Sequence, residues 1–147
     1  MDKELFIEYE GIRNKYRMAK IKYVNLLEKK AMLIIQTQPK SMDLSKDVTS
    51  GGKIVNKFDD FVQRLEKLDP EIQVARNERD LQEYFLKKKE IELRDSEDIL
   101  NQVYYLRFIK NTKVRHICYK LNYSKTQIYR DLEEIEKKIN YGKKWEN

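Results

Sequence analysis

Five side chains that can contact DNA bases lie within residues 125–130, near the C-terminus. They are Lys125, Thr126, Gln127, Tyr129 and Arg130. Lysine and arginine donate hydrogen bonds to guanine, glutamine pairs with adenine, and the threonine methyl group contacts the methyl group of thymine. We therefore predict that these five residues contact DNA bases from one exposed face of a helix.

A helix, a tight turn and a second helix are predicted to position these side chains. The first helix spans residues 113–121 and the second residues 125–140, with Asn122 in the left-handed conformation that a tight turn requires. Cys118 supplies a small side chain where the helices cross. Ser124 is the predicted N-cap of the second helix. The residues predicted to point inward are Val114, Ile117, Leu121, Ile128, Leu132 and Ile135.

A run of basic residues surrounds this motif. No acidic residue lies between Asp98 and Asp131, and the whole chain has a net charge of +6. Such a run favours binding to nucleic acid, and a solvated cationic face is the competing interpretation. Three glutamates farther along, Glu133, Glu134 and Glu136, limit the predicted groove contact to the first two turns. The residues predicted to contact DNA phosphates are Lys113, Arg115, Lys120 and Ser124.

Two long helices are predicted before the motif. Apolar residues recur every three or four positions within residues 3–38, which predicts one amphipathic helix that Pro39 ends. Residues 39–57 form a Ser- and Gly-rich linker, and residues 57–94 form the second long helix. The two helices are expected to pair as a long antiparallel, coiled-coil-like hairpin. The predicted fold is therefore all-α, with a helical hairpin followed by a C-terminal helix-turn-helix domain.

Local signals predict where these helices begin and which faces they bury. Asn56 is the predicted N-cap of the second helix, and Pro70 is predicted to kink it or to split it, with Asp69 capping the new helix. Asp95 and Ser96 are predicted to cap a third helix. The predicted inward residues are Phe6, Tyr9, Ile12, Tyr16, Ala19, Tyr23, Leu27 and Ile34 in the first helix, Phe58, Phe61, Leu65, Leu68, Ile72, Ala75, Leu81, Tyr84, Phe85, Lys88 and Ile91 in the second, and Ile99, Val103, Leu106 and Ile109 in the third.

These elements divide the chain into three predicted parts. Residues 1–94 form the hairpin arm, residues 95–141 the DNA-binding domain, and residues 142–147 a frayed tail. Most of the ten tyrosines are expected to pack within the helix stripes, with Tyr129 facing outward as the exception.

The C-terminal block DILNQVYYLRFIKNTKVRHICYKLNYSKTQIYRDLEEIEKKI resembles the region-four helix-turn-helix of sigma factors. More specifically, it is similar to small sigma-like regulators of Gram-positive phages and integrated elements, among them the ArpU-type late transcription regulators. The resemblance rests on residues 107–109, on the pattern I-x3-L-N-Y-S at residues 117–124 and on residues 128–130, and it extends over nearly the whole chain. Cys118 stands where the family usually has alanine, and the loop IKNTKVR is basic where the family often has a glutamate.

The resemblance implies a sequence-specific transcription regulator, in particular an activator, that binds double-stranded DNA. Its hairpin would form a homo-oligomer or dock on a partner such as RNA polymerase. Two other functions fit a helix-turn-helix joined to a helical arm. One is a small terminase-like DNA-packaging subunit, and the other is a helical adaptor or inhibitor that binds protein.

The sequence offers little for catalysis or for a cofactor. His116 and Cys118 are the only histidine and cysteine, too few for a structural zinc site. A nucleophilic Cys118 would need a base and an orienting group, and a buried small residue is the favoured interpretation. The segment SGGK at residues 50–53 lacks the earlier glycine and the following Ser or Thr of a phosphate loop. The adjacent acids at 59–60 and 133–134 point apart on a helix. We therefore expect no enzyme, no metal and no cofactor.

The expected location is the cytoplasm of a bacterial host cell. A single cysteine forms no intramolecular disulfide, which suits a reducing compartment. The N-terminus is charged from residue 2, unlike a signal peptide, and the longest apolar run, residues 31–35, is too short to span a membrane. No membrane partner is predicted.

Overall fold

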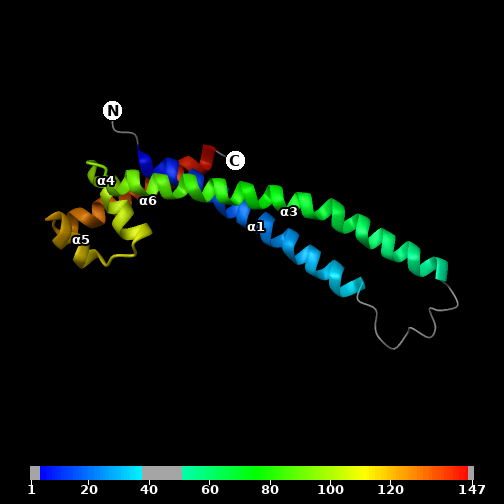
Figure 1. Ribbon diagram of the computed structural model, residues 1–147. Helices are drawn as coiled ribbons and strands as arrows, with labels where there is room; N and C mark the ends of the chain where they lie inside the picture. The colour runs from blue at the N-terminus through cyan, green and yellow to red at the C-terminus, as the bar shows by residue number, and fades with distance from the viewer. Residues whose placement is uncertain (1–3, 38–50, 146–147) are drawn as a thin grey trace. The chain divides into compact units, whose positions relative to one another are not determined.

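The computed structural model describes residues 4–37 and 51–145, and every regular element within them is a helix (Figure 1). The elements are α1 (Leu5–Thr37), α3 (Gly51–Arg94), α4 (Ile99–Tyr104), the π-helical turn η2 (Tyr105–Ile109), α5 (Val114–Leu121) and α6 (Lys125–Trp145). The all-α prediction is therefore confirmed for these ranges. None of their helices is both long enough and apolar enough to cross a membrane.

The described residues form two compact units. The core unit combines the residues up to Tyr16 with those from Gln82 onward, and the two-helix unit spans residues 17–81. This division differs from the predicted boundary at residue 94. The first turns of α1 and the last turns of α3 belong with the C-terminal helices.

Tyr104 lies in the centre of the core unit and is completely buried. Its ring stacks on Phe6 with centroids 5.6 Å apart, and the rings of Tyr9 and Phe108 lie at 5.8 and 5.1 Å. Its hydroxyl donates a hydrogen bond to Glu10. Aromatic pairs contribute about 0.5–1.5 kcal/mol each beyond the burial of their area, so this cluster fixes the start of α1 against α4. The other buried residues of this core are Leu93, Val103, Ile117, Ile128 and Ile135.

Polar contacts also join α1 to α3 within the core unit. Tyr9 donates its hydroxyl to Glu90 at 3.0 Å, and burial raises the pKa of the Tyr9 hydroxyl. The ammonium group of Lys89 binds Glu8 at 2.8 Å and Glu92 at 3.0 Å, and the hydrogen bond that it donates to the Glu8 carboxylate raises the pKa of Lys89. Polar side chains therefore occupy positions on the face of α3 that packs against α1.

In the two-helix unit, α1 and α3 run in opposite directions. The guanidinium of Arg79 lies 4.5 Å from the centroid of the Tyr23 ring, and Lys30 forms an ion pair with Asp69 at 2.8 Å. As the residue number rises along α1, the partner number on α3 falls. The residues buried in this unit are Ala19, Leu68 and Ala75.

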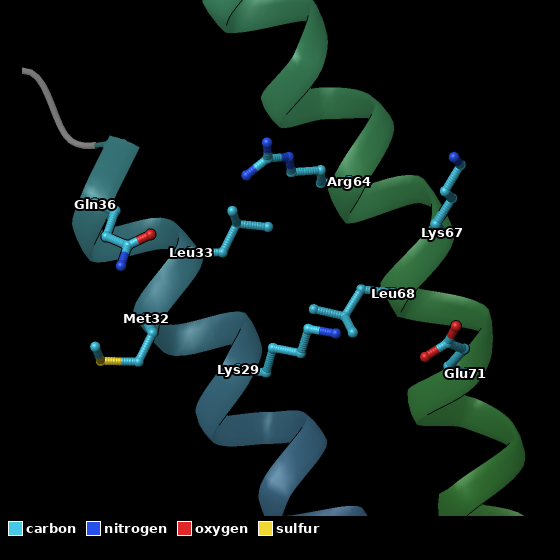
Figure 2. A pocket seen from close by; sticks show the side chains of 8 residues that line it. All are labelled: Lys29, Met32, Leu33, Gln36, Arg64, Lys67, Leu68 and Glu71. Carbon is cyan, nitrogen blue, oxygen red and sulfur yellow. The ribbon is translucent and has the colours of Figure 1, made fainter.

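A cavity of about 520 Å³ lies between these two helices. Leu33 of α1 and Leu68 of α3 point toward one another across it (Figure 2). Lys29, Arg64, Lys67 and Glu71 also line it, so the cavity has an apolar floor and a charged rim with three cations and one carboxylate.

The second long helix begins earlier than predicted and is not interrupted. Residue 51 already belongs to α3, so Asn56 lies inside the helix and is not its N-cap. Pro70 lies within the continuous helix, and Asp69 binds Lys30 instead of capping a new helix. A proline inside a helix costs about 3 kcal/mol. The packing of Leu68 and Ala75 on either side, 5% and 1% exposed, explains why α3 continues through it.

Because α3 is continuous through Pro70, the residues after Pro70 keep the helical phase of those before it. Part of the predicted inward-facing stripe of α3 is therefore wrong. Leu81, Tyr84, Phe85 and Ile91 were expected to point inward, but they are exposed by 41–61%. The inner face instead continues through Arg79, Leu86, Lys89 and Leu93, where polar residues interrupt the apolar pattern. The predicted inward residues Leu27 and Ile34 of α1 are also exposed, by 39% and 38%, and Lys88 is exposed. The side chain of Phe58 lies outside those described.

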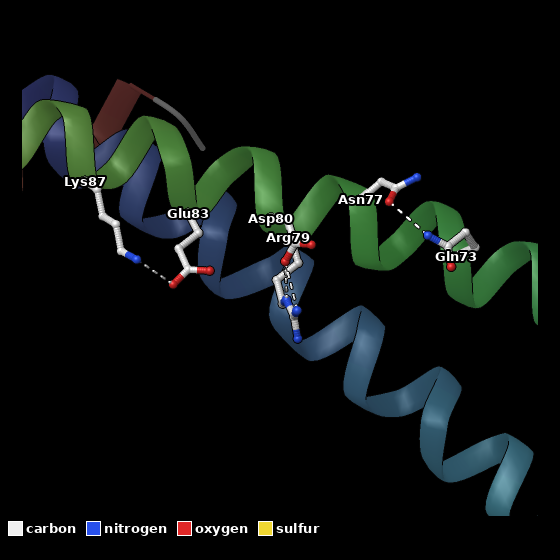
Figure 3. A network of polar contacts seen from close by, with 6 residues as sticks. All are labelled: Gln73, Asn77, Arg79, Asp80, Glu83 and Lys87. Atoms are coloured by element: carbon white, nitrogen blue, oxygen red, sulfur yellow. Dashed lines mark hydrogen bonds and ion pairs between the residues drawn. The ribbon is translucent and has the colours of Figure 1, made fainter.

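The outer surface of α3 carries short-range polar pairs (Figure 3). Gln73 donates to Asn77 at 3.1 Å, and Lys87 binds Glu83 at 3.4 Å. Such pairs four residues apart support a long helix by about 0.2–0.5 kcal/mol each.

The caps of the third helix also differ from the prediction. Asp98, not Asp95 or Ser96, is the N-cap of α4, and its carboxylate accepts a hydrogen bond from the backbone N–H of Leu100 at 3.0 Å. Ser96 instead accepts a hydrogen bond from the backbone N–H of Asp98 at 3.2 Å. At the other end of the chain, α6 continues to Trp145, beyond its predicted end at residue 140. Of the predicted linker at residues 39–57, residues 51–57 instead belong to α3, and residues 39–50 lie outside the described ranges, as do the last two residues of the chain.

Candidate nucleic-acid interface

The connection between α5 and α6 contains the predicted left-handed residue. Asn122 adopts φ 55° and ψ 39°, and the carbonyl of Cys118 accepts hydrogen bonds from the backbone N–H of Asn122 and of Tyr123, the latter at 3.2 Å. Asparagine is among the residues that tolerate this conformation. The hydroxyl of Ser124 accepts a hydrogen bond from the backbone N–H of Gln127 at 3.2 Å, so the predicted N-cap is also confirmed.

Three completely buried isoleucines hold α5 and α6 in the core unit: Ile117, Ile128 and Ile135. Their packing fixes the direction in which the other face of each helix points. Cys118 is half-buried against the same core, as expected for a small residue at the helix contact. The remaining predicted inward residues, Val114, Leu121 and Leu132, are partly buried against it.

Four of the five predicted base-contacting residues are exposed on the first two turns of α6. They are Lys125, Thr126, Tyr129 and Arg130. The ammonium of Lys125 lies 6.0 Å from the centroid of the Tyr129 ring, and Tyr129 is 52% exposed. The structure therefore brings one hydroxyl, one phenol and two cations onto a single exposed surface.

Gln127 differs from the other four. It is half-buried, and its side-chain amide donates a hydrogen bond to Asp131 Oδ1 at 3.0 Å. One of the two N–H donors of the amide that would pair with adenine is therefore engaged within α6.

The four residues predicted to contact phosphates are exposed on or beside α5. They are Lys113, Arg115, Lys120 and Ser124. Lys113 immediately precedes α5, in an extended conformation. Within the described part of the chain, no carboxylate forms an ion pair with these cations or with Lys125 and Arg130. Unpaired cations on one surface create a positive potential that attracts polyanions.

A buried carboxylate lies directly behind this surface. Asp131 is 4% exposed, and burial raises its pKa against the opposing effect of the Gln127 hydrogen bond. Its Oδ2 and the Oδ1 of buried Asn101 have no hydrogen-bond partner among the described residues. The sequence contained a signal for this burial, because residue 131 lies three positions after Ile128 and four before Ile135. It was missed because the acid was counted as part of the charge pattern.

The sequence pattern also did not predict that two tyrosines near the α5–α6 connection are exposed. Tyr119 on α5 is 85% exposed and Tyr123 is 42% exposed, contrary to the expectation that most tyrosines pack inside. Tyr119 lies one turn after Arg115, opposite the buried Ile117. A phenol at such a position can donate to a phosphate oxygen.

The later turns of α6 carry charges of both signs. Glu133 binds Lys137 at 3.3 Å and Glu134 binds Lys138 at 3.5 Å, so both acids form exposed ion pairs along the helix. His116 is exposed. No group of three potential metal ligands occurs among the described residues.

Comparisons with family models, with curated proteins and with solved structures found no match to this chain. The functional argument therefore depends on the geometry of this surface.

Proposed function

We propose that the protein is a sequence-specific transcription regulator that binds double-stranded DNA with a helix-turn-helix formed by α5 and α6. The observation that carries this proposal is the cluster of exposed donors on the first two turns of α6, beside cations that have no described carboxylate partner. Lys125, Thr126, Tyr129 and Arg130 would contact base edges, and Lys113, Arg115, Lys120 and Ser124 would contact phosphates.

The dimensions of α6 suit this role. Two helical turns extend about 11 Å, close to the roughly 12 Å width of the major groove. Ser124 and the first N–H groups of α6 would face a phosphate, where the helix dipole favours negative charge. The glutamates on later turns would remain outside the groove. This arrangement is what the resemblance to sigma region four and to phage-encoded late regulators implies.

The two-helix unit supports a homo-oligomer as part of the proposal. Along α1, positions 18, 21, 25, 28, 32 and 35 follow the steps of three and four of a coiled coil, and all six are exposed. Met18, Ile21, Met32 and Ile35 are 45–67% exposed. Asn25 at the middle of the stripe is the kind of polar residue that fixes the register of paired helices.

Selection from randomised duplexes at about 150 mM salt tests the DNA-binding proposal, because weak phosphate binding is suppressed there. We expect the wild-type protein to enrich one sequence. Arg130→Ala should lose about 1–3 kcal/mol of discrimination at one base pair. Lys137→Ala is the control, since Lys137 lies two turns farther along α6 and binds Glu133. Failure of the wild-type protein to enrich any sequence would contradict the proposal.

Sedimentation tests the oligomer separately. Met32→Glu together with Ile35→Glu should convert a dimer to a monomer, whereas Val74→Glu on the exposed surface of α3 should not. A ring of eight or more subunits would favour the DNA-packaging subunit instead.

A protein-binding adaptor is the second candidate function. The exposed apolar residues of α1 (Met18, Ile21, Met32 and Ile35) and the cavity of the two-helix unit are the observations that favour it. Absence of DNA affinity even at low salt would support the adaptor.

A further inference from the structure

A second group of basic residues in the core unit lines a cavity to which α6 contributes no residue. A cavity of about 730 Å³ is lined by residues from the end of α3, from α4, from η2 and the loop after it, and from α5. Three of these regions contribute one cation each: Arg94 at the end of α3, Lys110 in the loop after η2 and Lys120 in α5. No carboxylate lines the cavity.

The two lysines dominate the charge of this cavity. Arg94 donates to Asp95 at 3.0 and 3.3 Å, so part of its charge is already compensated. Neither Lys110 nor Lys120 forms an ion pair with any residue in the described ranges. Lys110 instead lies over the ring of Tyr105, with its ammonium 5.8 Å from the ring centroid.

The backbone holds Lys110 and Thr112 in place at the edge of the cavity. The π-helical turn closes with a hydrogen bond from the Lys110 N–H to the Tyr105 carbonyl at 3.0 Å. Asn111 then adopts a left-handed conformation with φ 53°, and the Thr112 N–H donates to the Leu106 carbonyl at 2.8 Å. Asparagine is one of the few residues other than glycine that tolerate this φ. Backbone hydrogen bonds therefore fix the residues that follow η2, from Lys110 to Thr112, against the end of the helix.

We propose that this cavity binds a phosphoryl group. Two lysines and an arginine arriving from three regions suit an anion that offers several charged oxygens to different donors. Lys120 belongs both to this cavity and to the cations beside α6. A bound duplex would therefore place one backbone phosphate here, outside the bases that α6 contacts. That duplex-bound form rests on the proposed DNA-binding function, whereas binding of a free phosphorylated compound does not.

The first test measures the salt dependence of duplex binding by Lys110→Gln. Removal of one phosphate contact should reduce the slope of log K against log salt by about 0.9, with the sequence preference unchanged. Between 50 and 200 mM salt, the affinity advantage of wild type over the variant should then shrink about threefold. Lys110→Arg should retain the wild-type slope. Lys87→Gln is the matched control, because Lys87 is an exposed lysine of the same unit that binds Glu83.

The second test omits DNA and titrates the full chain with inorganic phosphate and with pyrophosphate. Shifts of the Thr112 and Lys120 amide resonances that disappear in Lys110→Gln would identify a small phosphorylated compound as the ligand. A reduced slope in the first test without such shifts would identify the DNA backbone as the source of the phosphoryl group that the cavity binds. An unchanged slope together with no resonance shifts would overturn the inference. If the wild-type protein shows no preference for any DNA sequence, only the proposed function is refuted, and the inference that the cavity binds a phosphoryl group still stands.

Discussion

Gln127 and Asp131 form a hydrogen bond at 3.0 Å across one turn of α6, between the exposed surface and the core. Asp131 Oδ1 is the acceptor, and its Oδ2 has no partner among the described residues. One side chain of the predicted base-contacting set is thus tied to a buried carboxylate. The burial of Asp131 in the core and the side-chain position of Gln127 on α6 are therefore coupled at this pair.

Asp131→Asn should stabilise the protein at neutral pH by about 1 kcal/mol, because burial of a neutral amide costs less than burial of a carboxylate. Burial raises the pKa of Asp131 in the folded protein above its ordinary value of 3.8. The Asp131 carboxyl group therefore remains protonated in the folded state at a pH where it is already ionised in the unfolded state. Stability of the wild type should fall as pH rises from about 4 through the raised pKa, and then level off.

Thermal denaturation of both proteins between pH 3.5 and 8 measures this effect. The stability advantage of Asp131→Asn over the wild type should be small at the acidic end of this range and constant at the neutral end. Glu133→Gln, an exposed change of the same type on α6, should show no such trend. A wild-type protein that is more stable than Asp131→Asn at pH 7 would show that the carboxylate has a partner that compensates its burial.

Gln127→Ala should lower stability by about 1–3 kcal/mol, because it leaves both oxygens of a buried carboxylate without a partner. The base preference should remain unchanged, since the Gln127 amide already serves Asp131. Thr126→Ala provides the opposite pattern, with stability retained and a weaker preference for thymine at one position. Loss of an adenine preference in Gln127→Ala would show that Gln127 releases Asp131 when DNA binds.

The local features of the α5–α6 connection could be predicted because each depends on a few neighbouring residues. Asn122 and Ser124 have side chains with strong preferences for a left-handed turn and an N-cap, and both preferences hold. The inward isoleucines follow from spacing alone. The candidate site could therefore be located from sequence, but the engagement of Gln127 could not, because it depends on the burial of Asp131.

The long helices were harder to predict because their buried faces include polar residues. Arg79 and Lys89 take inward positions of α3 through contacts with Tyr23 and Glu8, which lie far away in the sequence. An apolar pattern cannot identify such positions. The start of α1 was likewise assigned to the hairpin, since the contact of Phe6 with Tyr104 joins residues almost a hundred positions apart.

Phe6→Ala should destabilise the core unit by about 3–5 kcal/mol, because it removes a completely buried ring that stacks on Tyr104. Circular dichroism melting curves would measure the loss. Lys22→Ala, at an exposed position of the same helix outside the stripe of positions 18–35 that is proposed to pair, is the control and should have little effect on the melting temperature. A fragment containing only residues 95–147 should fail to fold, although it includes the whole predicted DNA-binding domain. A folded fragment would show that the aromatic cluster with α1 is dispensable.

Pro70→Ala should stabilise α3, because alanine restores a backbone N–H and removes the clash with the preceding turn. The gain should be at most about 3 kcal/mol, the difference between proline and alanine in a helix interior. Pro70 is exposed and lies beside Asp69, which binds Lys30, so the substitution should not disturb the packing of Leu68. Denaturant unfolding would measure the gain, with Gln73→Ala as a control on the same exposed surface. A lower stability of Pro70→Ala would mean that α3 requires the proline geometry to keep its contacts with α1.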